Sequence, residues 1–355
     1  MTCAMKISVF LPNWVGDVVM ATPALRALRE HFGPSARLVG IMRPYVADVL
    51  AGTPWLDEHF VYDPHSFGSR LGGWSLVRRL RALRPDVAIL LPNSLRTAWF
   101  AWAGGARERI GYVRGGRGPL LTRKLAPARI GGRFAPTSAV DYFLELVYAA
   151  GCSPASRRLE LATSAADEQA AEAVWSKFRF WHDRGVVVLN TGGAFGAAKL
   201  WPSGYFAALA RRIAVEHQQG VLVICGPSER EAAREIVKGA KHPRVQSLAD
   251  ERLGVGLSKA CVRRGGLMVS TDSGPRHFAA AFHVPCVTLF GPTHIGWSEN
   301  YHPQAVHLQL DLDCVPCQRR TCPLGHHRCM RDLSIDEVYR AVKTRLELQA
   351  QGQAA

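Results

Sequence analysis

The sequence predicts an α/β protein made of two doubly wound domains, each with a mostly parallel sheet. Short apolar runs rich in Val, Ile and Leu alternate with amphipathic segments along the chain, which is the pattern of βαβ units. These units form two blocks, separated by a polar stretch rich in Ala and Ser. With 355 residues, 48% of them hydrophobic, the chain can bury two cores, so disorder and a small disulfide scaffold are excluded.

The first domain is expected at residues 1–165. Its apolar runs end at Pro, Gly or Asn, which is typical of short connections between strands and helices. The expected strands are 6–11, 37–42 and 86–91, and the expected helices are 18–30 and 71–83.

The second domain is expected at residues 185–333, followed by a C-terminal helix and tail at 334–355. The C-terminal helix, 334–349, opens with Ser334 and has Glu337 three residues later, which is the spacing of a capping box. The other expected elements are strands 185–190, 220–225, 266–270 and 285–290, and helices 203–216 and 228–239.

The chain is strongly basic. Its 44 Lys and Arg residues against 29 Asp and Glu give a net charge of +15, which favours an anionic partner such as nucleic acid, phosphate or acidic lipid. From Arg70 to Arg133, 14 basic residues are offset only by Asp86 and Glu108, so this segment alone carries +12. The tryptophans within it fit either base stacking in a nucleic-acid complex or the core of the domain.

Two observations predict a cytoplasmic protein. No apolar stretch reaches the ~18 residues of a membrane span, and the first apolar run meets Pro12 and Asp17, unlike a signal peptide. Five of the nine cysteines are scattered through apolar or helical surroundings, as reduced thiols are.

The turn after the first strand carries a candidate catalytic group. Gly16 and Asp17 follow strand 6–11 at the carboxyl end of the predicted sheet, where open α/β sheets bind ligands. Asp17 is therefore either a general base or the N-cap of the next helix. No Gly-x-Gly-x-x-Gly spacing follows this strand, which argues against an NAD-linked enzyme.

Two turns of the second domain suit a diphosphate. Small residues and Lys199 in segment 190–202 fit a phosphate-binding loop, although a flexible loop has the same composition. A helix is expected to begin near Pro275, with Asp272 or Ser273 as its cap and His277 one turn inside. The free N–H groups at the start of this helix would face a pyrophosphate. Alternatively, these residues only cap the helix.

Four cysteines lie close together near the end of the second domain, with the spacing Cys-x2-Cys-x4-Cys-x6-Cys. This set suits a structural zinc ion or an iron–sulfur cluster, and it also fits a reduced knuckle without metal. The cysteines are Cys314, Cys317, Cys322 and Cys329.

Four separated motifs resemble, in their order, those of the lipopolysaccharide heptosyltransferases, glycosyltransferase family nine, and especially the heptosyltransferase II type. The resemblance covers almost the whole chain, and the cysteine-rich segment is similar to that of many family members. The motifs are 12–17 (PNWVGD), 92–94 (PNS) with 109–112 (RIGY), 195–202 (FGAAKLWP), and 271–274 (TDSG) with His277.

The resemblance implies a GT-B fold, in which two Rossmann-like domains face each other across a cleft, with the acceptor in the first domain and the donor nucleotide in the second. It implies an inverting transfer of L-glycero-D-manno-heptose from ADP-heptose to the heptose of the lipopolysaccharide inner core, with no cofactor required. The +12 segment suits this anionic acceptor and a peripheral contact with the anionic inner membrane surface, and nucleic acid is not an expected partner.

The same resemblance implies roles for individual residues. Asp17 resembles the catalytic base, and Lys199 would neutralise charge on the departing ADP. The nucleotide sugar is expected at Thr191, Gly192, Gly193, Lys199, Asp272, Ser273, Gly274 and His277, with Glu229 or Glu231 near the ribose. The acceptor is expected at Asn13, Trp14, Gly16, Asn93, Ser94 and Arg109. The alternatives are a family member with another nucleotide sugar or acceptor glycan, and a basic nucleic-acid-binding protein with a zinc knuckle.

Overall fold

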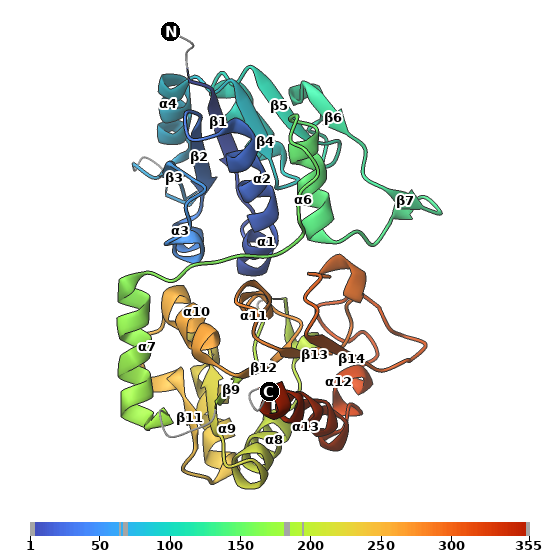
Figure 1. Cartoon of the computed structure of the whole chain (residues 1–355). Helices are drawn as coiled ribbons and strands as arrows, with labels where there is room; N and C mark the ends of the chain where they lie inside the picture. The colour runs from blue at the N-terminus through green and yellow to red at the C-terminus, as the bar shows by residue number, and fades with distance from the viewer. Residues whose placement is uncertain (1–3, 64, 67–69, 181–184, 194, 353–355) are drawn as a thin grey trace. The chain divides into compact units, whose positions relative to one another are not determined.

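The computed structural model describes residues 4–63, 65–66, 70–180, 185–193 and 195–352. The chain divides into two compact units (Figure 1). Unit 1 comprises Met1–Ala162 and Gly296–Asn300, and unit 2 comprises Thr163–Ile295 and Tyr301–Ala355. The segment Gly296–Asn300 was expected in the second domain but belongs to unit 1, where the Ser138 hydroxyl donates a hydrogen bond to the Glu299 carbonyl at 2.7 Å.

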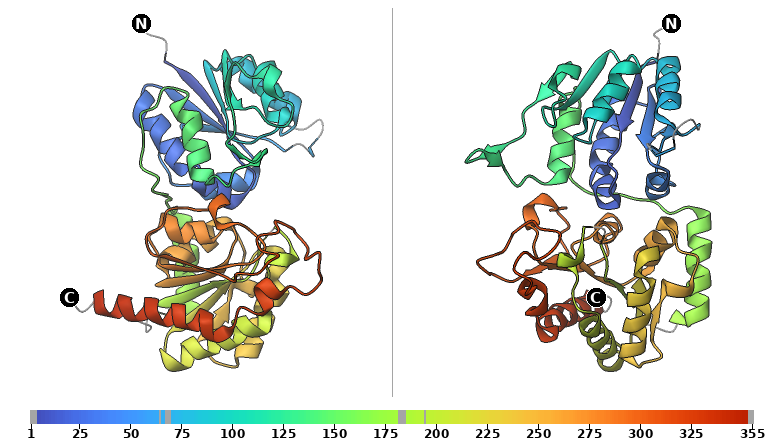
Figure 2. Two further views of the ribbon diagram at one scale, coloured as in Figure 1. Left: turned by 90° about the vertical axis from the view of Figure 1, so that its right-hand side faces the viewer. Right: turned by 180° about the vertical axis from the view of Figure 1, so that it is seen from behind.

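Unit 1 contains a six-stranded parallel sheet in the order β3-β2-β1-β4-β5-β6. This is the strand order of a Rossmann-like fold, and its switch point lies between β1 and β4. Helices cover both faces of the sheet, and a small antiparallel hairpin, β7–β8, projects from its side (Figure 2). The strands are β1 (Lys6–Phe10), β2 (Arg37–Met42), β3 (Glu58–Val61), β4 (Val87–Leu90), β5 (Glu108–Tyr112), β6 (Arg123–Leu125), β7 (Arg129–Ile130) and β8 (Arg133–Phe134). The helices are α1 (Val15–Met20), α2 (Thr22–Phe32), α3 (Pro44–Leu50), α4 (Gly73–Leu83), α5 (Leu95–Ala103) and α6 (Ala139–Tyr148).

Unit 2 repeats this topology, with a parallel sheet in the order β11-β10-β9-β12-β13-β14. Its switch point lies between β9 and β12, so both units bring the ends of their first and fourth strands together. The strands are β9 (Val186–Asn190), β10 (Gly220–Ile224), β11 (Val245–Ser247), β12 (Leu267–Thr271), β13 (Cys286–Phe290) and β14 (Ala305–Gln309). The α-helices are α7 (Ala165–Phe178), α8 (Ser203–Glu216), α9 (Arg230–Ala240), α10 (Val255–Arg264), α11 (Arg276–Ala281), α12 (Arg328–Arg331) and α13 (Ile335–Gly352).

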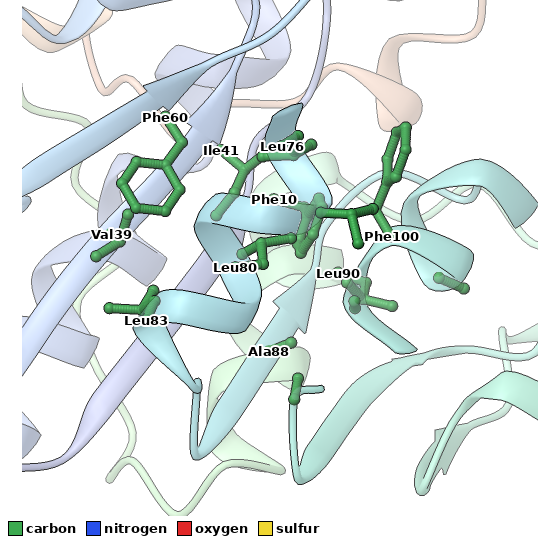
Figure 3. Close-up of a cluster of buried hydrophobic side chains, with 14 of the residues drawn as sticks. Phe10, Val39, Ile41, Phe60, Leu76, Leu80, Leu83, Ala88, Leu90 and Phe100 are labelled. Atoms are coloured by element: carbon green, nitrogen blue, oxygen red, sulfur yellow. The ribbon is translucent and has the colours of Figure 1, made fainter. Parts of the chain in front are cut away.

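A core of unit 1 lies between the sheet and helices α4 and α5 (Figure 3). Phe10 and Leu90 come from neighbouring strands and share this core with Leu76 and Leu80 of α4 and Phe100 of α5. Because helices cover both faces, the central strands β4, β9 and β10 are buried along their whole length and do not alternate between apolar and polar residues. The expectation of two doubly wound α/β units is confirmed.

Several predicted elements differ from the observed ones. The expected helix 18–30 is two helices, α1 and α2, which meet at Ala21. Pro23 lies in the first turn of α2, where its missing N–H is tolerated, whereas it would remove a hydrogen bond inside one continuous helix. Strands β3, β5, β6, β11 and β14 were not predicted, because polar residues interrupt their apolar ones and most of them lie at sheet edges. β3, β6 and β11 are also short, with three or four residues each.

The C-terminal helix begins as expected. The Ser334 hydroxyl accepts a hydrogen bond from the Glu337 backbone N–H at 3.2 Å, which caps the start of α13. No helix in the described part of the chain is both long and apolar enough to cross a bilayer.

Candidate active site

A cavity of about 370 Å³ opens in unit 1 where β1 and β4 end. Asp17 lines this cavity from the first turn of α1 and is half-buried. The N-cap of α1 is Trp14, so Asp17 is not the cap of its helix. The cavity is lined by Pro12, Asn13, Trp14, Asp17, Leu91, Pro92, Asn93, Arg114, Thr137, Ala139, Tyr142, Phe143 and Trp297.

Two side chains fix the amide of Asn93: Arg117, which is buried behind the cavity, and Tyr142, which is half-buried and lines it. The Oδ1 of Asn93 accepts hydrogen bonds from Arg117 Nη2 at 2.9 Å and from the Tyr142 hydroxyl at 3.1 Å. Both donors bind the same oxygen, so the amide must be oriented with Nδ2 on the other side, where it can donate into the cavity that Asn93 lines. The Tyr142 ring is itself held by stacking on Tyr112, with ring centroids 3.7 Å apart.

Arg117 is fully buried. Each hydrogen bond of its guanidinium goes to an uncharged oxygen: the carbonyls of Tyr112 and Pro92 and the side-chain oxygen of Asn93. Burial lowers the pKa of Arg117 to about 10, which still leaves it cationic at neutral pH. The wall behind the cavity therefore holds a positive charge that no carboxylate offsets in these contacts.

Three of the expected acceptor residues, Asn13, Trp14 and Asn93, line the cavity, and three do not. Gly16 is buried within α1 beside Asp17, and Ser94 is the N-cap of α5. Arg109 lies on β5 and donates to the carbonyls of Leu120 and Ala106 at 2.7 and 2.6 Å, so its guanidinium anchors a loop away from the cavity.

A cluster of buried charges lies in unit 2, where β9 and β12 end. Lys199 Nζ donates to Asp272 Oδ2 at 2.5 Å and to the Asp272 carbonyl at 3.0 Å. Arg276 Nε lies 3.3 Å from Asp272 Oδ1, and the Thr293 hydroxyl donates to Oδ2 at 2.7 Å. Lys199, Asp272 and Arg276 are all at least nine-tenths buried. Two cations thus share one carboxylate, which leaves the cluster with a net positive charge.

The charges in this cluster set the protonation of its neighbours. Burial alone would raise the pKa of Asp272, but Arg276 and Lys199 outweigh burial and hold that pKa well below its ordinary value. His277 is buried next to these cations, and burial followed by the charge of Arg276 holds its pKa well below the usual range. Asp272 is therefore ionised and His277 neutral at physiological pH.

The loop after β9 is shaped by Gly192. A Cβ on Gly192 would lie 1.7 Å from Glu229 Oε1, so only glycine allows the Glu229 carboxylate to rest against the loop. Glu229 also accepts a hydrogen bond from the Gly226 N–H at 2.7 Å. Glu231, in contrast, is exposed and lies 3.4 Å from Arg234. Of the two glutamates, Glu229 is the one that the structure brings to the loop.

The helix start near Pro275 differs from the prediction. The N-cap of α11 is Pro275, and neither Asp272 nor Ser273 caps it. Asp272 binds the cations instead, and the Ser273 hydroxyl accepts from Asn190 Nδ2 at 2.6 Å. The Thr271 hydroxyl donates to the Gly192 carbonyl at 3.0 Å, so these side chains join the two loops of the site.

The four clustered cysteines line a small cavity of about 20 Å³ in unit 2. Among the residues that the structure describes, no group of three or more His, Cys, Asp or Glu side chains is arranged to hold a metal ion. Burial, followed by the nearby Cys314, Cys317 and Cys322, raises the pKa of Cys329 to about 11. Hydrogen bonds from backbone N–H groups, the first from His327, lower the pKa of Cys322.

The family model of glycosyltransferase family 9 (heptosyltransferase) matches residues 73–328. The chain belongs to this family. Lipooligosaccharide heptosyltransferase 2 of Campylobacter jejuni is 26% identical over 359 residues, covering 97% of this chain and 99% of that protein. Lipopolysaccharide heptosyltransferase 2 of Escherichia coli is 27% identical over 346 residues, covering 94% and 96%. The resemblance to family nine is confirmed, and so is the expectation of a glycosyltransferase.

Solved structures show the fold that this family 9 member shares. The E. coli ADP-heptose lipopolysaccharide heptosyltransferase II matches with a TM-score of 0.79 at 22% identity, covering 98% of this chain and all of that one. A family 9 glycosyltransferase of Veillonella parvula matches with a TM-score of 0.81 at 22% identity, covering 98% of each chain. An E. coli heptosyltransferase solved with ADP matches with a TM-score of 0.72 at 16% identity, covering 96% and 100%. The GT-B fold class is confirmed.

The family 9 resemblance did not reveal every residue of the two sites. Arg114 and Tyr142 line the cavity of unit 1, and Arg276 binds Asp272 in unit 2. Arg114 stands two residues after the RIGY motif, a position that could have pointed to it. Trp297 reaches the cavity from a segment far along the chain, and no local pattern in the sequence indicates that contact.

Proposed function

We propose that the protein transfers L-glycero-D-manno-heptose from ADP-heptose to a heptose of the lipopolysaccharide inner core, with inversion at the anomeric carbon. Family membership and the full-length match to heptosyltransferase 2 proteins support the sugar and the acceptor. The observation that carries the assignment of roles is the pair of sites. One carboxylate lines a cavity at the switch point of unit 1, and buried cations gather at the switch point of unit 2.

Asp17 is the general base in this proposal. Its carboxylate takes the proton of the attacking acceptor hydroxyl, whose oxygen then bonds to the anomeric carbon. The bond from that carbon to the phosphate oxygen breaks, and ADP leaves with the bonding electrons. A carboxylate in the first turn of a helix, lining a cavity large enough for a sugar, has both the charge and the access for this role.

Lys199 stabilises the negative charge that develops on the departing ADP. Two hydrogens of its ammonium group are directed to Asp272, which leaves the third to donate to a phosphate oxygen. Asp272 fixes Lys199 before the donor arrives, and stabilisation by such preorganised charge is usually the largest single contribution to catalysis. Arg276 keeps the cluster cationic while Asp272 is occupied. In this proposal, the side chains of Lys199 and Arg276 supply the positive charge that stabilises the departing ADP.

Glu229 is the proposed contact to the ribose of the nucleotide. It lies against Gly192 in the loop after β9, whereas Glu231 is at the surface. Its carboxylate can accept hydrogen bonds from ribose hydroxyls. Thr191, Gly193, Ser273 and Gly274 remain proposed neighbours of the donor because they belong to the same pair of loops, and His277 remains one because it lies in the first turn of α11 beside Arg276.

Arg114, Asn93 and the buried Arg117 suit an anionic acceptor. Arg114 lines the cavity, Asn93 presents amide hydrogens to it, and Arg117 adds positive charge behind it. A lipid-linked acceptor of this kind would also bring the protein to an anionic membrane surface.

A structural metal ion at Cys314, Cys317, Cys322 and Cys329 remains a proposal. The four side chains line one small cavity, which supports a shared site, although they are not arranged around a metal ion in this structure. Zinc held there would stabilise the loop without taking part in transfer. Elemental analysis of the purified protein, with a Cys314→Ser and Cys317→Ser variant beside it, tests this.

Calorimetric titration with ADP, ADP-heptose, UDP and NAD, without added metal, tests the proposed function first. We expect binding of ADP and ADP-heptose alone. In an acceptor assay, Asp17→Asn should abolish transfer and keep ADP binding, and Lys199→Ala should weaken both. Preference for UDP would assign another sugar donor. Equal loss of ADP affinity in both variants would refute the assigned roles, and nucleic-acid binding without nucleotide binding would refute the function.

A further inference from the structure

Two tryptophans are exposed on the outer faces of α4 and α5. Trp74 is 70% exposed and Trp102 is 53% exposed, and Leu95 beside them is 52% exposed. Trp99 is half-buried and meets Trp74 edge to face, with ring centroids 5.7 Å apart. We call Trp74, Leu95, Trp99 and Trp102 the tryptophan face. On α5, positions 95, 99 and 102 recur at helical spacing, so they form one stripe.

The exposed tryptophan rings do not contribute to the hydrophobic core of unit 1. The inner faces of both helices are already filled, by Leu76, Leu80 and Leu83 on α4 and by Ala98 and Phe100 on α5 (Figure 3). The two helices also pack closely, since a Cβ on Gly104 would lie 2.5 Å from Leu80 Cβ. The tryptophan face is therefore an apolar surface on a rigid helix pair, and apolar surfaces of this kind mark sites of association.

Arginines surround the tryptophan face. Arg78 and Arg81 follow Trp74 by four and seven residues on α4, so they share its side of the helix, and both are exposed. Arg81 Nε donates to the Ala103 carbonyl at 2.8 Å, which places it at the end of α5 beside Trp102. Neither helix contains Asp or Glu, so the arginines give the surface around the tryptophan face a net positive charge.

We infer that the tryptophan face, with Arg78 and Arg81, docks on an anionic lipid bilayer. Tryptophan rings prefer the headgroup region because they are apolar with one polar N–H, and arginines are attracted to anionic headgroups. A partner protein would require matching acidic groups and a shaped surface, whereas a bilayer needs only the apolar rings and the positive charge seen here.

The tryptophan face adjoins the acceptor cavity. Asn93 lines the cavity, and Leu95 begins α5 two residues later. A bilayer lying against α5 would therefore hold a lipid-linked sugar near Asp17. This part of the inference rests on the proposed function, whereas the docking itself can be measured without any acceptor.

Sedimentation of the full-length protein with vesicles tests the docking. The vesicles contain three parts phosphatidylethanolamine to one part phosphatidylglycerol, and a second set contains phosphatidylcholine alone. We expect binding to the first set only, weakening from about 0.05 M to about 0.5 M salt. The double substitution Arg78→Ser with Arg81→Ser should reduce binding about thirty-fold, because each arginine contributes a factor of about five. Trp74→Ala with Trp102→Ala should reduce binding about ten-fold.

Matched controls lie in unit 2. Arg331→Ser with Arg340→Ser removes the same charge from exposed positions, and Val215→Ala with Leu348→Ala removes exposed apolar groups. These variants should bind as the unchanged protein does. Thermal melting checks that all variants are folded.

Vesicle binding by the tryptophan-face variants equal to that of the unchanged protein would overturn the inference. So would an equal loss in the controls. An assay of heptose transfer to an acceptor dispersed in detergent needs no bilayer. It therefore distinguishes a failure of the docking inference from a failure of the proposed function. The tryptophan-face variants should keep that transfer and lose transfer only to acceptor embedded in vesicles.

Discussion

The substitution Asn93→Asp tests the orientation of the amide in the cavity of unit 1, where we propose that the acceptor binds. The carboxylate would keep both hydrogen bonds that reach Oδ1, at 2.9 Å from Arg117 and 3.1 Å from Tyr142, but it would remove the N–H donors that face the cavity. A hydrogen bond to a charged group contributes about 1.5–3 kcal/mol, so KM for an anionic acceptor should rise about ten- to hundred-fold. KM for the donor should stay the same, since Lys199 and its partners lie in the other unit.

The same substitution should not destabilise the protein. It converts a neutral hydrogen bond to Arg117 into a charged one, which is stronger by about 1 kcal/mol, so urea unfolding should show equal or greater stability. Tyr142→Phe is the matched variant, because it removes one donor to Oδ1 while Arg117 still fixes the amide. Its acceptor KM should rise far less. An unchanged acceptor KM in Asn93→Asp, or equal rises for donor and acceptor, would refute the orientation argument.

Three other predictions concern unit 2. Gly192→Ala should lower ADP affinity in calorimetry because its Cβ displaces Glu229, whereas Gly204→Ala, with open space around its Cβ, should leave affinity unchanged; equal affinities would contradict the role of Glu229. His277 takes up its proton only well below the usual pH, so the unfolded chain gains a proton that the folded protein does not, and stability should fall as pH drops below about 6.5. His277→Gln should lessen that slope by up to about 1.4 kcal/mol per pH unit between about pH 5 and 6, and an unchanged slope in urea titrations would show that His277 titrates normally. Cys314→Ser with Cys317→Ser should lower the melting temperature more than it lowers turnover, and a folded but inactive variant would contradict a structural role.

The sequence predicted where the strands that precede the two candidate sites end. Asp17 follows β1 and Lys199 follows β9, each at a turn that Gly or Pro marks. The strand order could not be obtained in this way, because it depends on pairing between residues far apart. The short edge strands β3 and β11 were missed for the same reason, since partners and not local periodicity define them.

The contacts that give the site residues their properties could not be predicted. Lys199 and Asp272 are 73 residues apart, and Arg117 lies 24 residues from Asn93. Arg109 belongs to a family motif and yet anchors a loop, while Arg117 eight positions later reaches the cavity wall. Both are arginines in a basic segment, and only the fold decides which carbonyl oxygens each one meets.

The two sites hold buried positive charge in different ways, and the difference matches the roles proposed for them. In unit 2, Asp272 offsets part of the charge of Lys199 and Arg276 and holds both cations in place while no donor is bound. In unit 1, Arg117 is held by uncharged oxygens, so no carboxylate offsets its charge in these contacts. A leaving diphosphate needs cations that are already in place when charge develops, whereas an acceptor that stays anionic throughout needs attraction before and after the reaction. The carboxylate of Asp272 meets the first requirement in unit 2, and the uncharged partners of Arg117 meet the second in unit 1.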